Sequence, residues 1–229
     1  MFNHIPFLKQ SIALGVSVLL SILLLIFRIF YSSKITYIFL LWNLFLAIIP
    51  YVLTLFIFSL SHRANSKINF YFLVFIWLLF YPNSLYVITD FIHLKKRHNI
   101  PLWYDSILIF SFVWNGIFLG FFSLRINHLV VEKEFSKYLG WIFSFCVLGL
   151  SSVGIYLGRF LRFNSWDVFH NPKIFFVNLF QVLSNPKYPF TDMGIILILF
   201  VFYGFAYVTL VNFIELKNEA LGNRQGYLK

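Results

Sequence analysis

The chain has 229 residues, of which 60% are hydrophobic and 11% are charged, and its mean hydropathy is +0.83. A soluble domain usually carries about 25% charged residues, so this chain has too little polar surface to cover a water-soluble fold. The net charge of +10 does not indicate nucleic acid, because no basic and aromatic reading platform accompanies it. The composition predicts an integral membrane protein whose basic residues set topology or contact anionic lipid headgroups.

Six segments are long enough to cross a membrane, for which roughly 20 mostly apolar residues are needed. We therefore predict an all-α, polytopic bundle of about six transmembrane helices in a single domain, 1–229. No small-residue cleavage site follows the first segment, so we interpret it as a transmembrane helix and not as a signal peptide. The predicted spans are approximately 10–30, 36–60, 68–90, 106–126, 138–160 and 192–215.

The third span is unusual because its uninterrupted apolar run, from Ile68 to Tyr81, is too short to cross the membrane at 1.5 Å per residue. The crossing must therefore include Pro82. Proline removes a backbone donor and crowds the preceding turn, so we expect the helix to be broken at Pro82. The break is either a simple kink near the membrane surface or a broken helix that builds a binding site, as in transporters.

The six spans divide the acidic residues completely between the two faces of the membrane. Side A holds both chain ends, the loop near Arg63 and the loop 125–137; side B holds the loops near Lys34, 93–104 and 162–190. All four glutamates fall on side A. All four aspartates fall on side B, and they are Asp90, Asp105, Asp167 and Asp192.

Most of the polar residues embedded in the spans also lie nearer to side B. Such residues are costly in lipid and usually face the bundle interior or a water-filled cavity, so we predict a polar pocket that opens on side B. Its candidate catalytic residues are Asp90, His93, Asp105 and Asp167, and its candidate substrate-binding residues are Asn43, Asn83, Arg159, Arg162 and Asn164.

Two kinds of chemistry are considered for this pocket. Asp90 and His93 are three residues apart, so on a helix they share a face, and a third carboxylate such as Asp105 would complete a metal site. Asp105 also fits a capping role at the start of the fourth span. The guanidinium groups of Arg159 and Arg162 suit phosphate or carboxylate recognition, or they complement a helix end and pair with aspartates.

Two small-xxx-small motifs, Gly116–Gly120 and Gly154–Gly158, predict close helix packing. Since a short loop joins the fourth and fifth spans, we expect these two spans to pack against each other. The sequence contains no Ser-His-Asp triad, zinc-protease motif, phosphate loop or dinucleotide fingerprint. It therefore specifies no metal and no cofactor.

Five strings of the chain stand out, and they are Leu41–Leu44, Ile49–Tyr51, Phe80–Leu94 (Pro-Asn-x-x-Tyr-x-x-Thr-Asp-x-x-His), Trp103–Asp105 and Gly158–Asp167 (Gly-Arg-Phe-Leu-Arg-x-Asn-Ser-Trp-Asp). Together they resemble a bacterial family of multi-pass membrane proteins classed as a domain of unknown function. The resemblance extends from the second span to the sixth. It implies a bacterial cytoplasmic-membrane protein, and its motif residues are mostly those gathered on side B.

The orientation follows from the basic residues, because cytoplasmic loops carry an excess of lysine and arginine. The 18 basic residues divide evenly, nine to each side. If Arg28, Arg159 and Arg162 are left out of the count because they are embedded, side A has nine basic residues and side B has six. We therefore expect both termini to be cytoplasmic and the pocket to face outward.

Three functions are compatible with this pattern. The first is a membrane-embedded enzyme acting on a lipid or lipid-linked envelope substrate, with Asp90 and His93 as general acid or base and the two arginines holding an anionic group. The second is a transporter, which the Pro82 break and Asn115 suggest, although side A offers no embedded polar residues to line a route. The third is a non-catalytic assembly partner in which the polar strings serve packing and capping.

Overall fold

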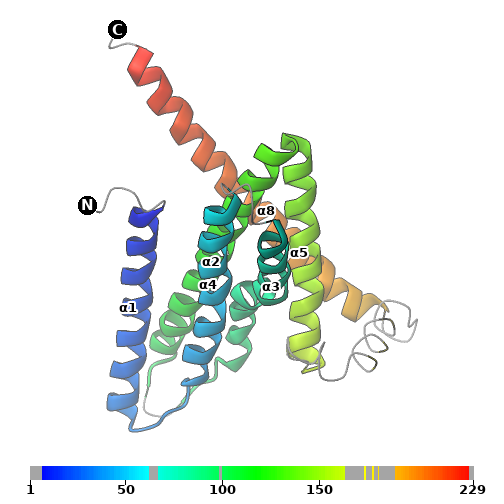
Figure 1. Cartoon of the computed structure of the whole chain (residues 1–229). Helices are drawn as coiled ribbons and strands as arrows, with labels where there is room; N and C mark the ends of the chain where they lie inside the picture. Colours follow the sequence, from blue (N-terminus) through cyan, green and yellow to red (C-terminus); the bar gives the residue numbers. More distant parts are fainter. Residues whose placement is uncertain are drawn as a thin grey trace. The chain divides into compact units, whose positions relative to one another are not determined.

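The computed structural model describes residues 7–61, 67–97, 100–162 and 189–226, together with positions 173, 177 and 180. Within these residues the side chains at 67–68, 189–192 and 217–226 are not described. The described elements are all helical, and a single isolated β-bridge between Arg97 and Ile100 accompanies them (Figure 1).

Six helical segments of the described chain are long and apolar enough to cross a membrane. This confirms the predicted all-α fold with six membrane-spanning helices. The elements in chain order are α1 (Leu8–Ser32), α2 (Phe39–Ser61), α3 (Lys67–Tyr86), the 3₁₀ helix η1 (Val87–His93), α4 (Leu102–Glu134), α5 (Lys137–Phe160) and α8 (Pro189–Gly226). The third span combines α3 and η1, from Asn69 to His93.

The chain divides into two compact units, Met1–Val130 and Val131–Lys229. Unit 1 contains α1, α2, α3, η1 and most of α4, and unit 2 contains α5 and α8. We describe each unit by itself, and the single membrane domain expected from the sequence stays a prediction.

Helix α4 is longer than the predicted span 106–126, because it continues to Glu134. The residues after 126 looked like the start of a hydrophilic loop, yet Asn127, His128 and Val130 are buried. Burial of this last part of the helix within the fold explains why the helix does not end at the polar residues.

The glycines of α4 pack against the third span, and the expected packing of α4 against α5 stays a prediction. A Cβ on Gly116 would lie 2.7 Å from the Ser84 carbonyl oxygen, and one on Gly120 would lie 3.0 Å from the Ser84 Cβ. Only glycine permits so close an approach of two helices at these positions. The motif therefore joins α4 to the junction of α3 and η1.

The interruption expected at Pro82 lies one turn further along the chain. The α-helix continues through Pro82 to Tyr86, and the change is a tightening into the 3₁₀ helix that starts at Val87. Because α3 stays helical through Pro82, the break expected at this residue is wrong. In the same turn, Asn83 Nδ2 donates to the Phe80 carbonyl of its own helix at 3.0 Å.

Pro50 lies inside α2, close to a contact with a neighbouring helix. In the turn before Pro50, the Ala47 carbonyl accepts a hydrogen bond of 2.9 Å from Ser84 Oγ. Ser84 thereby fixes α3 to α2 at the same point where it meets the α4 glycines.

Unit 2 is a helix pair formed by α5 and α8. Helix α5 begins with Ser136, whose side chain accepts the Leu139 backbone N–H at 3.2 Å. A glycine of each helix lies under a phenylalanine of the other. A Cβ on Gly149 would be 3.7 Å from the Phe200 ring, and one on Gly204 would be 3.4 Å from the Phe145 ring.

Candidate functional site

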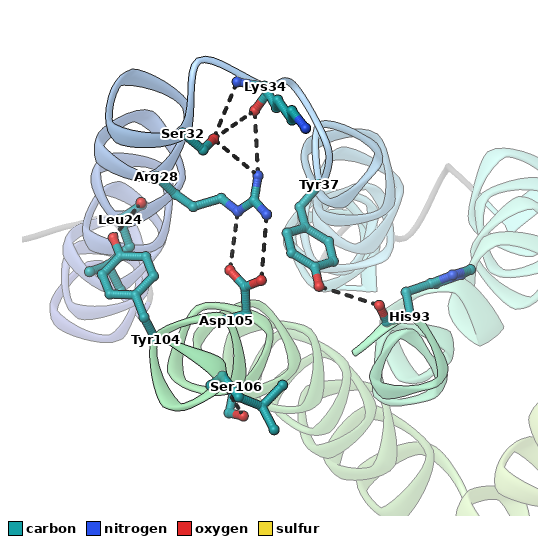
Figure 2. Close-up of polar contacts among 10 residues, drawn as sticks. Leu24, Arg28, Ser32, Lys34, Tyr37, His93, Tyr104, Asp105 and Ser106 are labelled. Carbon is teal, nitrogen blue, oxygen red and sulfur yellow. Dashed lines mark hydrogen bonds and ion pairs between the residues drawn. The ribbon is translucent and has the colours of Figure 1, made fainter. Parts of the chain in front are cut away.

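At the side-B end of unit 1, the end of α1, the start of α2, the end of η1 and the start of α4 come together (Figure 1). Polar groups from these segments form hydrogen bonds and an ion pair between the helices (Figure 2). Most of the sequence-predicted site residues of unit 1 belong to this region. The pocket expected there stays a prediction.

The centre of the region is an ion pair between Arg28 of α1 and Asp105 of α4 (Figure 2). The Arg28 Nε donates to Asp105 Oδ1 at 3.1 Å, and Nη2 donates to Oδ2 at 3.4 Å. Both side chains are 1% exposed. The two parallel bonds form the bidentate geometry in which a guanidinium and a carboxylate bind most strongly.

The remaining guanidinium nitrogen of Arg28 bonds the turn that follows α1. Nη1 lies 3.4 Å from Ser32 Oγ and 3.4 Å from the Lys34 carbonyl oxygen. Ser33 supplies the turn with a left-handed backbone, φ 51°. All three nitrogens of this buried guanidinium are therefore hydrogen-bonded, which lowers the cost of removing its charge from water.

The ring of Tyr37 forms one wall of this cluster. It is fully buried, and the Arg28 guanidinium carbon lies 4.7 Å from its centroid, in the geometry of a cation–π contact. The Tyr37 hydroxyl donates to the His93 carbonyl at 3.3 Å (Figure 2). Tyr37 thus connects the Arg28–Asp105 pair to the end of η1. We call Arg28, Asp105 and Tyr37 the ionic cluster.

Asp90 forms a second buried contact in the same part of unit 1. Its side chain is 0% exposed, and its Oδ2 accepts a hydrogen bond of 2.8 Å from Asn43 Nδ2 of α2. The sequence placed Asn43 and Asp90 in one site, and the structure brings these two together. Asp90 stands on η1, directly after the turn of α3 that contains Pro82.

The other two predicted site residues of the third span are less buried than Asp90. The His93 side chain is exposed at the end of η1, and its ring packs edge-on against Phe39 with centroids 4.8 Å apart. It is the backbone carbonyl of His93 that bonds Tyr37. Asn83 is half-buried and donates to the carbonyl of Phe80 in its own helix.

The predicted site residues that follow α4 in the chain belong to unit 2, which is described by itself. Arg159 is half-buried near the end of α5 in unit 2, and Arg162 is exposed with a left-handed backbone, φ 60°. Asn164 and Asp167 lie outside the described residues. Among the residues that the structure describes, no group of three histidine, cysteine or acidic side chains lies close enough to hold a metal ion.

Comparison with known protein families finds a match to the family described as protein of unknown function (DUF1361), over residues 42–205. The chain belongs to the DUF1361 family. The match includes Asn43, Asp90 and Asp105 but starts after Arg28. Comparison with curated proteins and with solved structures finds no match.

A second buried polar cluster of this DUF1361 protein lies in the half of unit 1 nearer side A. Thr54 Oγ1 and Ser123 Oγ share a hydrogen bond of 2.8 Å, and Trp77 Nε1 donates to Ser123 Oγ at 2.7 Å. Asn127 Nδ2 donates to Thr54 Oγ1 at 2.9 Å. We call these four residues the neutral cluster. The expectation that side A offers no embedded polar residues is therefore wrong.

Between the two clusters, Asn115 links α4 to α1. Its Nδ2 lies 2.8 Å from Ser21 Oγ, 3.2 Å from the Ser17 carbonyl and 2.9 Å from the Ser111 carbonyl. Its Oδ1 is buried without a hydrogen-bond partner among the described residues. The mid-membrane asparagine noted in the sequence is thus mainly a contact between two helices.

Sequence reasoning missed the partner of Asp105. Arg28 was treated only as an embedded residue, and Asp105 as a metal ligand or helix cap. A signal was present, because Arg28 lies four residues before the end of α1 and Asp105 lies three after the start of α4. Both helix ends face side B, so the two opposite charges stand at similar depth. Opposite charges at one depth in lipid are expected to pair.

Proposed function

We propose that this DUF1361 protein is a membrane-embedded enzyme of the bacterial cytoplasmic membrane, acting on a lipid or lipid-linked envelope substrate at side B. The observation that carries the proposal is Asp90, a fully buried carboxylate within a membrane span that Asn43 holds at 2.8 Å. Ionisable groups inside spans are costly and by default mark functional sites. The Arg28–Asp105 pair is connected through Tyr37 to the end of η1, the helix that carries Asp90.

In this proposal Asp90 and His93 act as general acid and base. They stand three residues apart on a 3₁₀ helix, in which residues at this spacing lie one above the other. Asp90 is buried and His93 is exposed at the membrane surface, where a headgroup arrives. Asp105 is already engaged by Arg28, so we assign it a positioning role. The proposal uses residues of unit 1 alone, and the roles expected for Arg159, Arg162, Asn164 and Asp167 stay predictions of the sequence.

The experiment is complementation of a bacterial host whose own copy has been deleted. Membrane lipids and envelope precursors are compared by mass spectrometry after expression of wild type, Asp90→Asn or the control Ser106→Ala. Ser106 also lies at the start of α4, but its hydroxyl donates to the Leu102 carbonyl of its own helix. We expect Ser106→Ala to restore the lipid profile, and Asp90→Asn to fold without restoring it.

Two outcomes would contradict the enzyme. If Asp90→Asn restores the profile, the carboxylate has no catalytic role. If Asp90→Asn fails to accumulate as folded protein, the polar residues serve packing, as expected of a non-catalytic assembly partner. Thermal unfolding of the purified variants distinguishes the second outcome from loss of catalysis.

Transport is a second candidate function, because the neutral cluster and Asn115 place buried polar groups along α4 from Asp105 to Asn127. A carrier needs polar groups along its route through the membrane. Replacement Asn115→Leu separates the two functions, since a carrier would lose uptake into vesicles while an enzyme with its site at side B would keep its activity. Unchanged uptake would count against transport.

We further propose that both termini are cytoplasmic and that side B faces outward. The burial of Arg28 supports leaving it out of the count of basic residues that set topology. In a Cys146→Ser background, Lys34→Cys on side B and Lys9→Cys on side A are exposed positions for labelling with an impermeant maleimide. We expect intact cells to label Lys34→Cys alone, and the reverse pattern would overturn the orientation.

A further inference from the structure

A second guanidinium lies against the buried ring of Tyr37. The chain between η1 and α4 brings Arg97 back to this ring, with its guanidinium carbon 5.3 Å from the centroid. A backbone bridge between Arg97 and Ile100 closes the same segment. Tyr37 therefore contacts two cations, Arg28 at 4.7 Å and Arg97.

The two arginines differ in their hydrogen bonding. Arg28 has partners for all three of its nitrogens, including both oxygens of Asp105. The Arg97 Nε is buried and has no hydrogen-bond partner among the described residues. A buried donor that lacks a partner costs free energy, more so when it carries charge. Such a group in a folded protein calls for an explanation, and a bound anion is one explanation.

The charge of this region is unbalanced. Among the described residues at the side-B end of unit 1, five basic side chains face two acidic ones, Asp90 and Asp105, which gives a surplus of three positive charges. Both acids are buried, and Asp105 already binds Arg28. The basic residues are Arg28, Lys34, Lys95, Lys96 and Arg97, of which the three lysines are exposed.

Aromatic side chains place this basic region at the depth of lipid headgroups. Tyr31 is 66% exposed at the end of α1, and Trp103 is 64% exposed at the start of α4. Exposed tyrosine and tryptophan at the ends of spans are typical of the membrane–water interface. A basic site at that depth is next to phosphate groups of the bilayer, which attract juxtamembrane lysine and arginine.

We propose that Arg97, Lys95 and Lys96 bind the phosphate group of an anionic phospholipid at side B. The guanidinium rests on Tyr37, so its direction is fixed, and a guanidinium fork matches two oxygens of a phosphate. The two exposed lysines add charge without requiring a fixed geometry. This site goes beyond the proposed enzyme, because the lipid is bound without being converted and Asp90 takes no part.

The test is native mass spectrometry of the full chain in a neutral detergent, titrated with phosphatidylglycerol or with phosphatidylcholine. We expect wild type to retain phosphatidylglycerol preferentially. Arg97→Gln should weaken that binding roughly tenfold and leave phosphatidylcholine binding unchanged, because it removes charge-assisted hydrogen bonds to the phosphate. The matched control is Lys9→Gln, which removes one charge from an exposed lysine at the opposite end of α1.

The double variant Lys95→Gln, Lys96→Gln keeps the proposal testable if Arg97→Gln disturbs folding, since both lysines are exposed. It should weaken phosphatidylglycerol binding at an unchanged Tm. The proposal is overturned if wild type shows no preference for phosphatidylglycerol, or if Lys9→Gln weakens binding as much as the side-B variants do. Displacement of the lipid by millimolar inorganic phosphate would assign the site to a soluble phosphate and overturn the lipid assignment.

Discussion

The two buried polar clusters of unit 1 differ in charge. The ionic cluster at side B contains a guanidinium and a carboxylate, Arg28 and Asp105, each 1% exposed. The neutral cluster nearer side A contains only hydroxyl, amide and indole groups, bonded from Thr54 through Ser123 to Trp77. When a neutral group in a membrane loses its partner, the loss of unfolding free energy is little more than that of one hydrogen bond. When a buried charge loses its partner, the loss is several times larger.

The same contrast separates the two carboxylates at side B. Asp105 has two bonds from a guanidinium, and Asp90 accepts a bond from the amide of Asn43. An amide can bond either a carboxylate or a neutral carboxamide, whereas a buried guanidinium requires a negative charge. The comparison therefore indicates that Asp105 supports the fold through its bond to a charged partner.

The largest effect is expected from Asp105→Asn. It leaves the Arg28 guanidinium buried without a counter-charge, and breaking a buried pair in this way costs about 3–5 kcal/mol. Thermal unfolding of the purified protein measures the loss. The double variant Arg28→Met, Asp105→Leu removes both charges and should recover most of the stability. A double variant as unstable as Asp105→Asn would show that the pair is not the source of the effect.

A smaller loss is expected where α4 passes between the two clusters. Gly116→Ala places a methyl group 2.7 Å from the backbone oxygen of Ser84, and such overpacking costs about 1–3 kcal/mol. The control is Gly15→Ala in α1, whose added Cβ meets nothing within 4 Å. Gly15→Ala should instead stabilise the protein slightly, since alanine favours a helix. Equal effects of the two substitutions on the Tm would argue against the close approach.

The neutral cluster is expected to be less sensitive. Thr54→Val keeps the shape of the side chain but removes the hydroxyl that bonds Ser123 and Asn127. Hydrogen bonds between helices in a membrane contribute about 1 kcal/mol, so the loss of unfolding free energy should be near that value. Thr209→Val is the control, because the Thr209 hydroxyl donates to the Phe205 carbonyl of its own helix. A loss as large as that of Asp105→Asn would remove the distinction between the clusters.

The smallest effect on stability is expected from Asp90→Asn. The new carboxamide oxygen can still accept the bond from Asn43, so the unfolding free energy should change by less than about 1 kcal/mol. The identical substitution at Asp105 should cost several times more. Measuring both variants in parallel by thermal unfolding tests the comparison directly, and equal losses would assign Asp90 a structural role as well.

Much of the fold was predictable because helix formation in lipid depends on local sequence. A stretch of about 20 apolar residues must form a spanning helix to satisfy its own backbone, which determined the six spans. The predictions failed where contacts between helices decide the outcome. Helix α4 extends past Asn127 because its end is buried, and the third span changes form at Val87 and not at Pro82. The candidate site was predicted in part, since Asn43 and Asp90 do meet.

By itself the sequence determined the class of protein, the number of spans and the location of all four aspartates on side B. These follow from hydropathy and from the alternation of successive spans across the membrane. Only the tertiary structure decided that Arg28 pairs with Asp105, 77 residues away, and that Gly116 meets Ser84. The physical reason is that hydropathy fixes how deep a residue lies, whereas its partner depends on which helices are neighbours and how each is rotated about its axis.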